Sequence, residues 1–384
     1  DGPQITVFAR EVADPDGLDR PFLVFLQGGP GFEAPRPIGP ASGWLGRVLR
    51  DYRVLMLDQR GTGRSTPIGD LPGMTPQQQA DYLALFRADS IVRDAELVRK
   101  AMGVEKWSVL GQSFGGFCAM TYLSIAPEGL REAMFTGGVP PVGVHPDEVY
   151  AATYRTMRDR NRRYYLRYPD DRERVLRIKE MLDGGDGVML PDGDQLTFRR
   201  FRQIGSRLGM ADGAEHVHYL LEQDPRSPAF GYDVAGTLFS SRNPLYVVIH
   251  EACYADGAIT NWSAERTLPA DFADDPTLLT GEHVYSWMLT DYGRLGPLRE
   301  AAELLAQREW PRLYDEDRLR ACTVPAAAAV YAEDAYVDRS FSEATAAMIP
   351  TMRPWLTNEY QHSGIGENGD HVLDRLIGLV KGRL

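Results

Sequence analysis

Cysteine is scarce in this sequence: among 384 residues only Cys118, Cys253 and Cys322 occur. Their number is odd and they lie far apart, so they form neither a disulfide framework nor a zinc-binding pattern. This favours a reducing compartment, and we expect a cytoplasmic protein. No secretory leader is recognisable, but the chain opens on Asp1 rather than Met, which leaves a removed leader as the alternative.

Long apolar runs and dense clusters of basic residues are also missing. No stretch approaches the roughly 20 apolar residues that a membrane-spanning helix needs. We find no internal repeat and no low-complexity tract, and the formal net charge is −12. A nucleic-acid partner or an anionic membrane surface is therefore not expected, whereas a substrate with a positive group fits this balance. The oligomeric state stays unknown at this level.

Short runs of apolar, β-branched or aromatic residues recur in the first and last parts of the chain and predict buried strands. They lie at 5–10, 22–26, 52–57, 107–110, 133–135, 326–332 and 354–360. One amphipathic helix is predicted at 81–103, where apolar residues recur at helical spacing and Gly103 suits a helix end. Strands that alternate with helices indicate a mostly parallel α/β sheet.

The pattern changes between about Val139 and Tyr314, where helical stretches rich in Arg and Tyr give way to loops rich in Gly, Asp and Pro. No strand there is as convincing as those on either side. We therefore predict an α/β catalytic domain formed by 1–140 and 315–384, and a mainly helical cap domain formed by 141–314. The insertion is expected at the carboxyl ends of the strands, where open α/β sheets bind ligands.

The segment VLGQSFGG at 109–116 sets three glycines around Ser113. Gly-x-Ser-x-Gly between a strand and a helix is a nucleophile elbow, in which the neighbours of the serine must be small. A strand is predicted before this segment and an apolar helical run after it. Ser113 is thus the predicted nucleophile, and a plain glycine turn is the alternative.

A serine nucleophile needs a base that a carboxylate orients, and in this fold they follow in the order Ser, Asp or Glu, His. The loop after the sixth predicted strand offers Glu333, Asp334 and Asp338. We favour Asp334, which opens the loop, with Glu333 as the main competitor. His362 follows the last strand in a Gly- and Ser-rich loop and is the predicted base, ahead of His371 in the first turn of the final helix.

Backbone N–H groups are expected to stabilise the oxyanion of the tetrahedral intermediate. One donor is Phe114, directly after the serine. The other is expected from the Gly-rich segment 25–32, with Gly29 ahead of Gly28. No metal or cofactor is predicted, since His216 and His218 have no third ligand at a useful spacing.

Three motifs, in this order and spacing, resemble the proline iminopeptidase (prolyl aminopeptidase) family of α/β-hydrolases. They are QGGPG at 27–31, DQRGTGRS at 58–65 and GQSFGG at 111–116. The resemblance is strong over about 1–140 and 310–384 and weaker through the insertion, which in the family is a helical cap. Gln27 stands where the family often has His, but the oxyanion donor is backbone and should be unaffected.

The resemblance implies an α/β-hydrolase fold and a serine aminopeptidase that releases an N-terminal residue, usually proline, from small peptides through an acyl-enzyme. It implies that Asp334 and His362 complete a triad with Ser113. Within the second motif, Asp58 and Arg60 are interpreted as structural residues that hold the loops around the site.

An aminopeptidase must recognise a free N-terminal ammonium group, which requires carboxylates in a partly desolvated pocket. Family members use glutamates of the cap for this. Glu251 and Glu282 each lie in an aromatic, weakly charged segment and are the candidates, and helix capping or pairing with arginines is the alternative. Other readings are an esterase, an aminopeptidase of different specificity, or a catalytically silent binding protein, which would require a broken triad.

Overall fold

Seven strands form one sheet in the computed structural model, which describes residues 4–185 and 187–384. Its order is β1-β3-β2-β4-β5-β6-β7, and β1 alone among these strands is antiparallel to its neighbour. The strands are β1 (Phe8–Val12), β2 (Phe22–Leu26), β3 (Arg53–Asp58), β4 (Trp107–Gln112), β5 (Leu130–Thr136), β6 (Ala326–Tyr331) and β7 (Met352–Thr357). The predicted mostly parallel sheet is confirmed.

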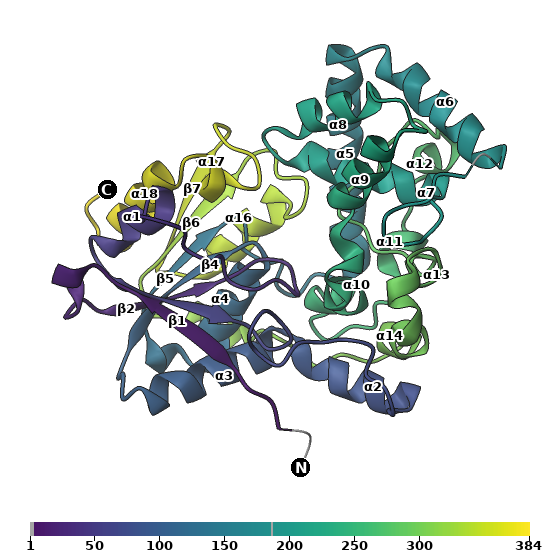
Figure 1. The fold of residues 1–384 in the computed structure, drawn as a ribbon. Helices are drawn as coiled ribbons and strands as arrows, with labels where there is room; N and C mark the ends of the chain where they lie inside the picture. Colours follow the sequence, from purple (N-terminus) through teal and green to yellow (C-terminus); the bar gives the residue numbers. More distant parts are fainter. Residues whose placement is uncertain (1–3, 186) are drawn as a thin grey trace.

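Helices cover both faces of this sheet (Figure 1). Alternate residues of a strand point to opposite faces, so Leu23 and Phe25 of β2 join one apolar cluster while Val24 and Leu26 join the other. Helices α1 (Gly43–Leu49) and α18 (Gly369–Val380) contribute to the first cluster, and α3 (Ala88–Ala101), α4 (Phe114–Ile125) and α16 (Arg339–Met348) to the second. Burial on both faces explains why the central strands read as continuous apolar runs.

The helix predicted at 81–103 is in fact two helices, α2 (Pro76–Leu83) and α3, with a short 3₁₀ turn between them. The backbone of Arg87 is extended, with φ −79° and ψ 173°, and interrupts the helix. Its buried guanidinium donates hydrogen bonds to three carbonyl oxygens, those of Ala252, Ala255 and Pro311. The amphipathic pattern correctly predicted helical structure here. The interruption between the two helices depends on contacts with residues far along the chain.

The last strand, β7, begins two residues before the predicted start. It ends three residues before the predicted end. Pro354 lies inside β7, opposite Ala328 of β6. Proline is tolerated at this place because β7 is an edge strand, where the missing N–H interrupts no ladder between two strands. Two of the six strand residues are buried, so the strand carries a weak apolar signal.

The segment between β5 and β6 is helical, apart from an isolated bridge between Met189 and Gln195, in the part that the structure describes. Figure 1 draws the helices of residues 141–314 beside the sheet. They are α5 (Pro146–Arg167), α6 (Asp171–Asp183), α7 (Phe198–Phe201), α8 (Gly213–Leu221), α9 (Pro228–Thr237), α10 (Pro244–Ile249), α11 (Ser263–Arg266), α12 (Ala270–Asp274), α13 (Met288–Asp291) and α14 (Arg299–Ala306), and α15 (Glu316–Arg320) follows them before β6. The division into domains at 140/141 and 314/315 stays a prediction.

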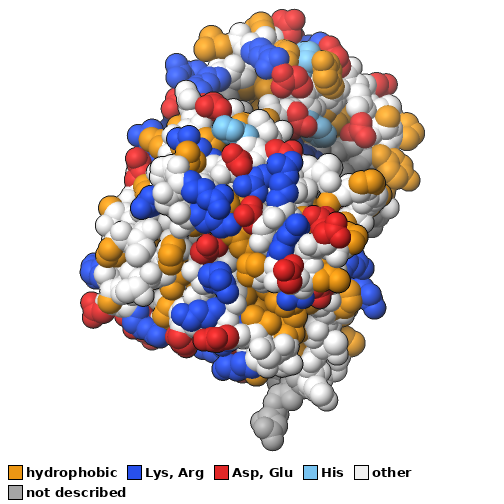
Figure 2. Space-filling model, turned by 90° about the vertical axis from the view of Figure 1, so that its left-hand side faces the viewer, with side chains coloured by type: hydrophobic (Ala, Val, Ile, Leu, Met, Phe, Trp, Pro, Cys, Tyr) orange, Lys and Arg blue, Asp and Glu red, His pale blue; other side chains and the backbone are white. Residues whose placement is uncertain are grey.

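Basic and acidic side chains are interspersed on the face shown in Figure 2. Ion pairs also join helices of the insertion, such as Arg158 with Asp271 and Arg266 with Asp147. Among the helices described, none is both long enough and apolar enough to cross a membrane.

Candidate active site

Ser113 lies at the sharp turn between β4 and α4, with φ 53° and ψ −125°. A residue with a side chain adopts positive φ rarely and at an energetic cost, and such strain is typical of functional turns. The surrounding structure therefore has to hold this conformation in place.

The glycines around Ser113 are required by close backbone packing. A Cβ atom on Gly111 would lie 2.3 Å from the carbonyl oxygen of Gly115, and one on Gly115 would lie 1.9 Å from that of Leu26. A Cβ on Gly138, at the end of the neighbouring strand, would lie 2.2 Å from the carbonyl oxygen of Ser113. No side chain fits at these positions, so the glycines allow the serine turn to pack against two adjacent strands.

Ser113, His362 and Asp334 form a continuous hydrogen-bonded chain. His362 Nε2 lies 2.9 Å from Ser113 Oγ, and His362 Nδ1 lies 2.8 Å from Asp334 Oδ2. The other oxygen of Asp334 accepts hydrogen bonds from the backbone N–H groups of Tyr336 at 2.8 Å and Val337 at 3.0 Å. The carboxylate is thus fixed on one side by the loop and faces the imidazole on the other.

The alternative acids and the alternative base lie elsewhere. Glu333 points to the insertion, where its carboxylate pairs with Arg163 at 2.5 Å. Asp338 caps α16 by accepting from the N–H of Ser340. His371 is exposed and its ring lies 5.5 Å from that of Trp355. The structure therefore brings together the three residues that the sequence favoured.

The pKa of His362 lies above its ordinary value. Burial lowers this pKa, but the charge and hydrogen bond of Asp334 and the charge of Glu282 raise it by more. Both carboxylates favour the imidazolium that forms when His362 accepts a proton. The site is therefore suited to general base catalysis by this histidine.

A small cavity of about 10 Å³ adjoins the serine. It is lined by Gly29, Pro30, Ser113, Phe114, Phe117, His250, Cys253, Tyr254, Glu282 and Val337. Gly29, the favoured second oxyanion donor, lies at this cavity with φ +133°, while a Cβ on Gly28 would lie 2.9 Å from Ser113 Cβ. The cavity is about the size of one water molecule, so a substrate residue requires it to widen.

Glu282 is partly buried and lines the cavity next to the serine. Its Oε1 accepts a hydrogen bond of 2.6 Å from the hydroxyl of Tyr246. Burial raises the pKa of Glu282 to about 7, against the opposing effects of the Tyr246 hydrogen bond and the charge of His362. A carboxylate in this position is well placed to attract a cation bound beside Ser113.

Glu251 has a different environment, although it is also buried in the insertion. Its two oxygens accept from the backbone N–H groups of Ser263 at 3.0 Å and Ala264 at 2.9 Å, in the first turn of α11. Burial raises the pKa of Glu251 to about 7, while these hydrogen bonds lower it. Glu282 lines the cavity at Ser113, and Glu251 is not among its lining residues.

Asp58 holds the loop that carries Gly29. Its carboxylate pairs with Arg36 at 2.5 Å and accepts from the backbone N–H groups of Ala34 and Arg64. This agrees with its interpretation as a structural residue. Arg60 forms a two-point ion pair with Asp94 of α3, away from the serine.

Several cavity residues carry no motif and could not be found by sequence reasoning. Phe117, His250, Tyr254 and Val337 come from three segments far apart in the sequence, and only the fold places them around Ser113. In the described residues no group of three or more His, Cys, Asp or Glu side chains is arranged to hold a metal ion.

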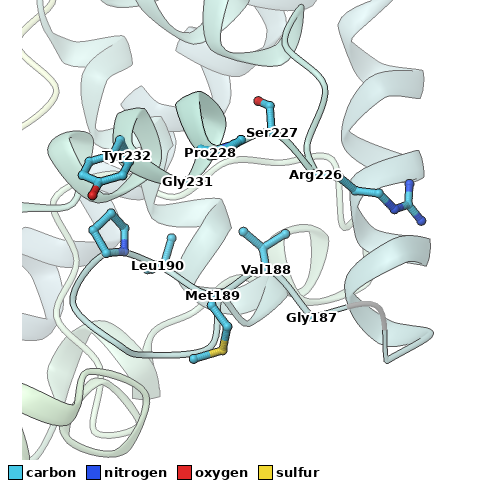
Figure 3. A pocket seen from close by; sticks show the side chains of 10 residues that line it. Gly187, Val188, Met189, Leu190, Arg226, Ser227, Pro228, Gly231 and Tyr232 are labelled. Atoms are coloured by element: carbon cyan, nitrogen blue, oxygen red, sulfur yellow. The ribbon is translucent and has the colours of Figure 1, made fainter.

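A larger hollow of about 530 Å³ lies within the insertion (Figure 3). Residues 187–191 and 226–232 contribute to its walls, which include the exposed side chains of Met189 and Tyr232. It shares no lining residue with the cavity at Ser113. This hollow is therefore separate from the triad.

The parallel sheet with its antiparallel first strand, and the elbow after β4, define a member of the α/β-hydrolase class, as predicted. Residues 21–179 match the family model described as alpha/beta hydrolase fold. A proline iminopeptidase from Aeromonas sobria is 46% identical over 98% of this chain and 91% of that protein. Proline iminopeptidase aneH from Aspergillus aculeatus is 34% identical over 99% of this chain and 90% of that protein. The chain belongs to the proline iminopeptidase family.

Among solved structures, a proline iminopeptidase from Mycobacterium smegmatis is similar with a TM-score of 0.48 and 15% identity, over 98% of this chain and 94% of that chain.

Proposed function

We propose that this protein is a serine aminopeptidase that releases an N-terminal residue, foremost proline, from small peptides. Its membership of the proline iminopeptidase family supports this, together with the triad geometry. Ser113 is the nucleophile, His362 the base, and Asp334 orients the imidazole. Phe114 and Gly29 supply the oxyanion donors.

The reaction follows from these positions. Ser113 Oγ attacks the carbonyl carbon of the first residue while His362 Nε2 takes its proton. The backbone N–H groups of Phe114 and Gly29 stabilise the oxyanion, and Asp334 stabilises the imidazolium. His362 then gives the proton to the departing amine, leaving an acyl-enzyme. A water molecule activated by His362 releases the amino acid and restores the serine.

The observation that carries the aminopeptidase proposal is the position of Glu282, which lines the same cavity as Ser113. A carboxylate there favours an ammonium group, whereas an uncharged ester gains nothing from it. The geometry gives less support to Glu251 as a second amine ligand, because its oxygens face the N–H groups of α11.

We also propose that residues 141–314 act as a cap domain over a catalytic domain of 1–140 and 315–384. Support comes from the cavity, because Gly29, Ser113 and Phe114 belong to the sheet region while His250 and Glu282 belong to the insertion.

The expected partners are peptides with a free N-terminus, and neither nucleic acid nor membrane is expected for a chain of net charge −12. The expected location is the cytoplasm, a proposal supported by three cysteines that are all buried and unpaired.

A panel of chromogenic aminoacyl amides tests the function. The prolyl amide should be cleaved fastest, its N-acetylated form should be resistant, and simple esters should be poor substrates. Equal cleavage of free and acetylated amides, or faster turnover of esters, would contradict the aminopeptidase proposal. A preference for another aminoacyl amide would retain the aminopeptidase but change its substrate.

A further inference from the structure

His250 is a polar side chain of the cavity that the steps above do not use. It directly follows α10, is 3% exposed, and lines the cavity together with Ser113 and Glu282. Neither of its ring nitrogens has a hydrogen-bond partner among the residues that the structure describes. Buried polar groups are nearly always paired, so an unpaired imidazole beside a nucleophile requires an explanation.

A second buried histidine shows that this fold can satisfy such a ring. His283 Nδ1 accepts a hydrogen bond from the N–H of Gly281 at 3.1 Å, and its Nε2 lies 3.0 Å from the hydroxyl of Thr153. His250 differs from His283 in lining the cavity at Ser113. We take this difference to indicate a ligand group as the missing partner of His250.

Tyr246 places His250 close to Glu282. The ring of Tyr246 lies 4.8 Å from that of His250, and its hydroxyl donates to Glu282 Oε1 at 2.6 Å. The ring of Tyr254 lies 6.0 Å from that of His250. The imidazole therefore contacts two aromatic rings and shares its cavity with the carboxylate of Glu282.

The charge state of His250 decides what it can bind. Burial lowers the pKa of His250 to about 4, so the ring is neutral at neutral pH. A neutral imidazole has one N–H donor and one nitrogen that accepts a hydrogen bond. The accepting nitrogen can therefore form a hydrogen bond with an N–H group of a cation.

We propose that His250 binds the N-terminal amine of the substrate together with Glu282. The unprotonated ring nitrogen accepts a hydrogen bond from one N–H of the ammonium, and the carboxylate accepts from another. A prolyl ammonium has two N–H groups, so these two acceptors satisfy both. This inference rests on the proposed aminopeptidase function. It adds an uncharged group, the imidazole of His250, as a second ligand for the amine.

Replacement of His250 by phenylalanine tests the proposal, because His250→Phe keeps an aromatic ring beside Tyr246 and Tyr254 and removes both nitrogens. We expect kcat/KM for a prolyl chromogenic amide to fall about ten- to a hundredfold, as expected for a hydrogen bond to a charged group, mainly through a higher KM. Turnover of a small uncharged ester should be unchanged. His250→Gln, which keeps an accepting oxygen, should recover part of the loss.

Thermal melting separates this role from a structural one. The nitrogens of His250 form no hydrogen bond within the described chain, so Tm should not fall in His250→Phe. Tyr314→Phe is the matched control, since it removes another buried, unpartnered polar atom that does not line this cavity, and it should leave both activities unchanged.

Three results would overturn the inference: equal losses on amide and ester, a loss that follows a lowered Tm, or no loss on the amide. The wild-type protein tests the proposed function independently. If it cleaves free and N-acetylated prolyl amides equally, the aminopeptidase function fails and the role of His250 fails with it. If only the variant results disagree, the aminopeptidase stands without this ligand.

Discussion

At Ser113 the backbone geometry and the chemistry can be separated by mutation. Ser113→Ala removes the hydroxyl that His362 faces at 2.9 Å and changes little else in the packing of the turn. We expect kcat for the prolyl amide to fall by about 10⁴ to 10⁶, the usual result of removing a triad residue. Tm should stay close to that of the wild type, which a thermal melt would measure.

His362→Ala should give a loss of the same order, because the serine then has no base. His371→Ala is the matched control, since this histidine is exposed on α18 and contacts no triad residue. Retention of more than about one hundredth of wild-type kcat in Ser113→Ala would contradict the assignment. Inactivity of His371→Ala would contradict the choice of base.

The pH dependence of catalysis should report His362 and Glu282 together. His362 must be unprotonated to act as a base, and its pKa is raised by Asp334 and Glu282 against the effect of burial. Glu282, with a pKa raised to about 7, must be ionised to bind the ammonium. We therefore expect kcat/KM for the prolyl amide to fall as the pH decreases through about 7. In Glu282→Gln the fall should be shallower, which a pH profile of kcat/KM would measure for both proteins.

The contribution of Glu282 to folding stability should fall as the pH rises, opposite to the expected trend in kcat/KM. Its folded pKa lies above the ordinary value of 4.5, so its favourable contribution is present below about pH 4.5 and is lost as the pH rises to about 7. Glu282→Gln should therefore gain stability relative to the wild type over that interval. A constant difference in Tm across it would argue against an ionisable, partly buried Glu282.

Motif spacing was sufficient to name three residues that the structure joins by hydrogen bonds, but not to distinguish the two glutamates. Ser113, Asp334 and His362 follow strands in a fixed order, so their places could be inferred from the chain alone. Glu251 and Glu282 lie in similar aromatic segments, and their surroundings differ because α11 folds against one of them and Tyr246 against the other. The sequence has no local signal for such contacts.

Among the elements, α11 depends on Glu251. This four-residue helix has no side-chain cap of its own, and the carboxylate of Glu251 accepts from its first two N–H groups. Glutamine has one accepting oxygen, so Glu251→Gln leaves a buried donor unpaired, at a cost of about 1–3 kcal/mol. We expect a lower Tm in calorimetry, and amide and ester activities that change together.

Glu282→Gln provides the contrast, because we expect it to lower amide activity about ten- to a hundredfold and to spare the ester. An amine-selective loss in Glu251→Gln, at unchanged Tm, would return Glu251 to the amine pocket as the sequence predicted.

The sheet was predictable because each central strand is buried on both faces, whereas the elements decided by distant contacts were not. The apolar pattern of 81–103 continues through the turn between α2 and α3, and only the contacts of Arg87 explain the interruption. In β7 the edge position allows Pro354 within the strand. Long-range contacts and edge positions leave little trace in local periodicity.

For the whole molecule, access to the triad depends on how the insertion meets the sheet region. The cavity of about 10 Å³ is lined by residues of both parts, so binding requires the two to separate locally or the lining to rearrange. The same boundary is crossed by buried contacts. Arg87 at the start of α3 is 1% exposed, and its guanidinium lies 4.6 Å from the ring centre of Trp310.

Removal of the Arg87 guanidinium should therefore weaken the attachment of the insertion. Arg87→Met keeps most of the side-chain length but leaves the carbonyl oxygens of Ala252, Ala255 and Pro311 without this donor. The oxygen of Ala252 keeps the backbone N–H of Ala255 as a donor, so two buried acceptors lose their partner. Each costs about 1–3 kcal/mol, and we expect a loss of at least about 2 kcal/mol in the free energy of unfolding. Denaturant unfolding followed by tryptophan fluorescence would measure it.

Arg93→Met on the same helix is the matched control. Arg93 is 65% exposed and pairs at the surface with Asp89, and surface pairs contribute about 0–1 kcal/mol. If the insertion and the sheet region unfold as one cooperative unit, Arg87→Met should shift a single transition to lower denaturant. If the Arg87 guanidinium stabilises only the insertion, a separate transition should appear at lower denaturant. Prolyl amide activity should be lost in that first transition. Equal stability of the two variants would show that the buried guanidinium does not secure the insertion.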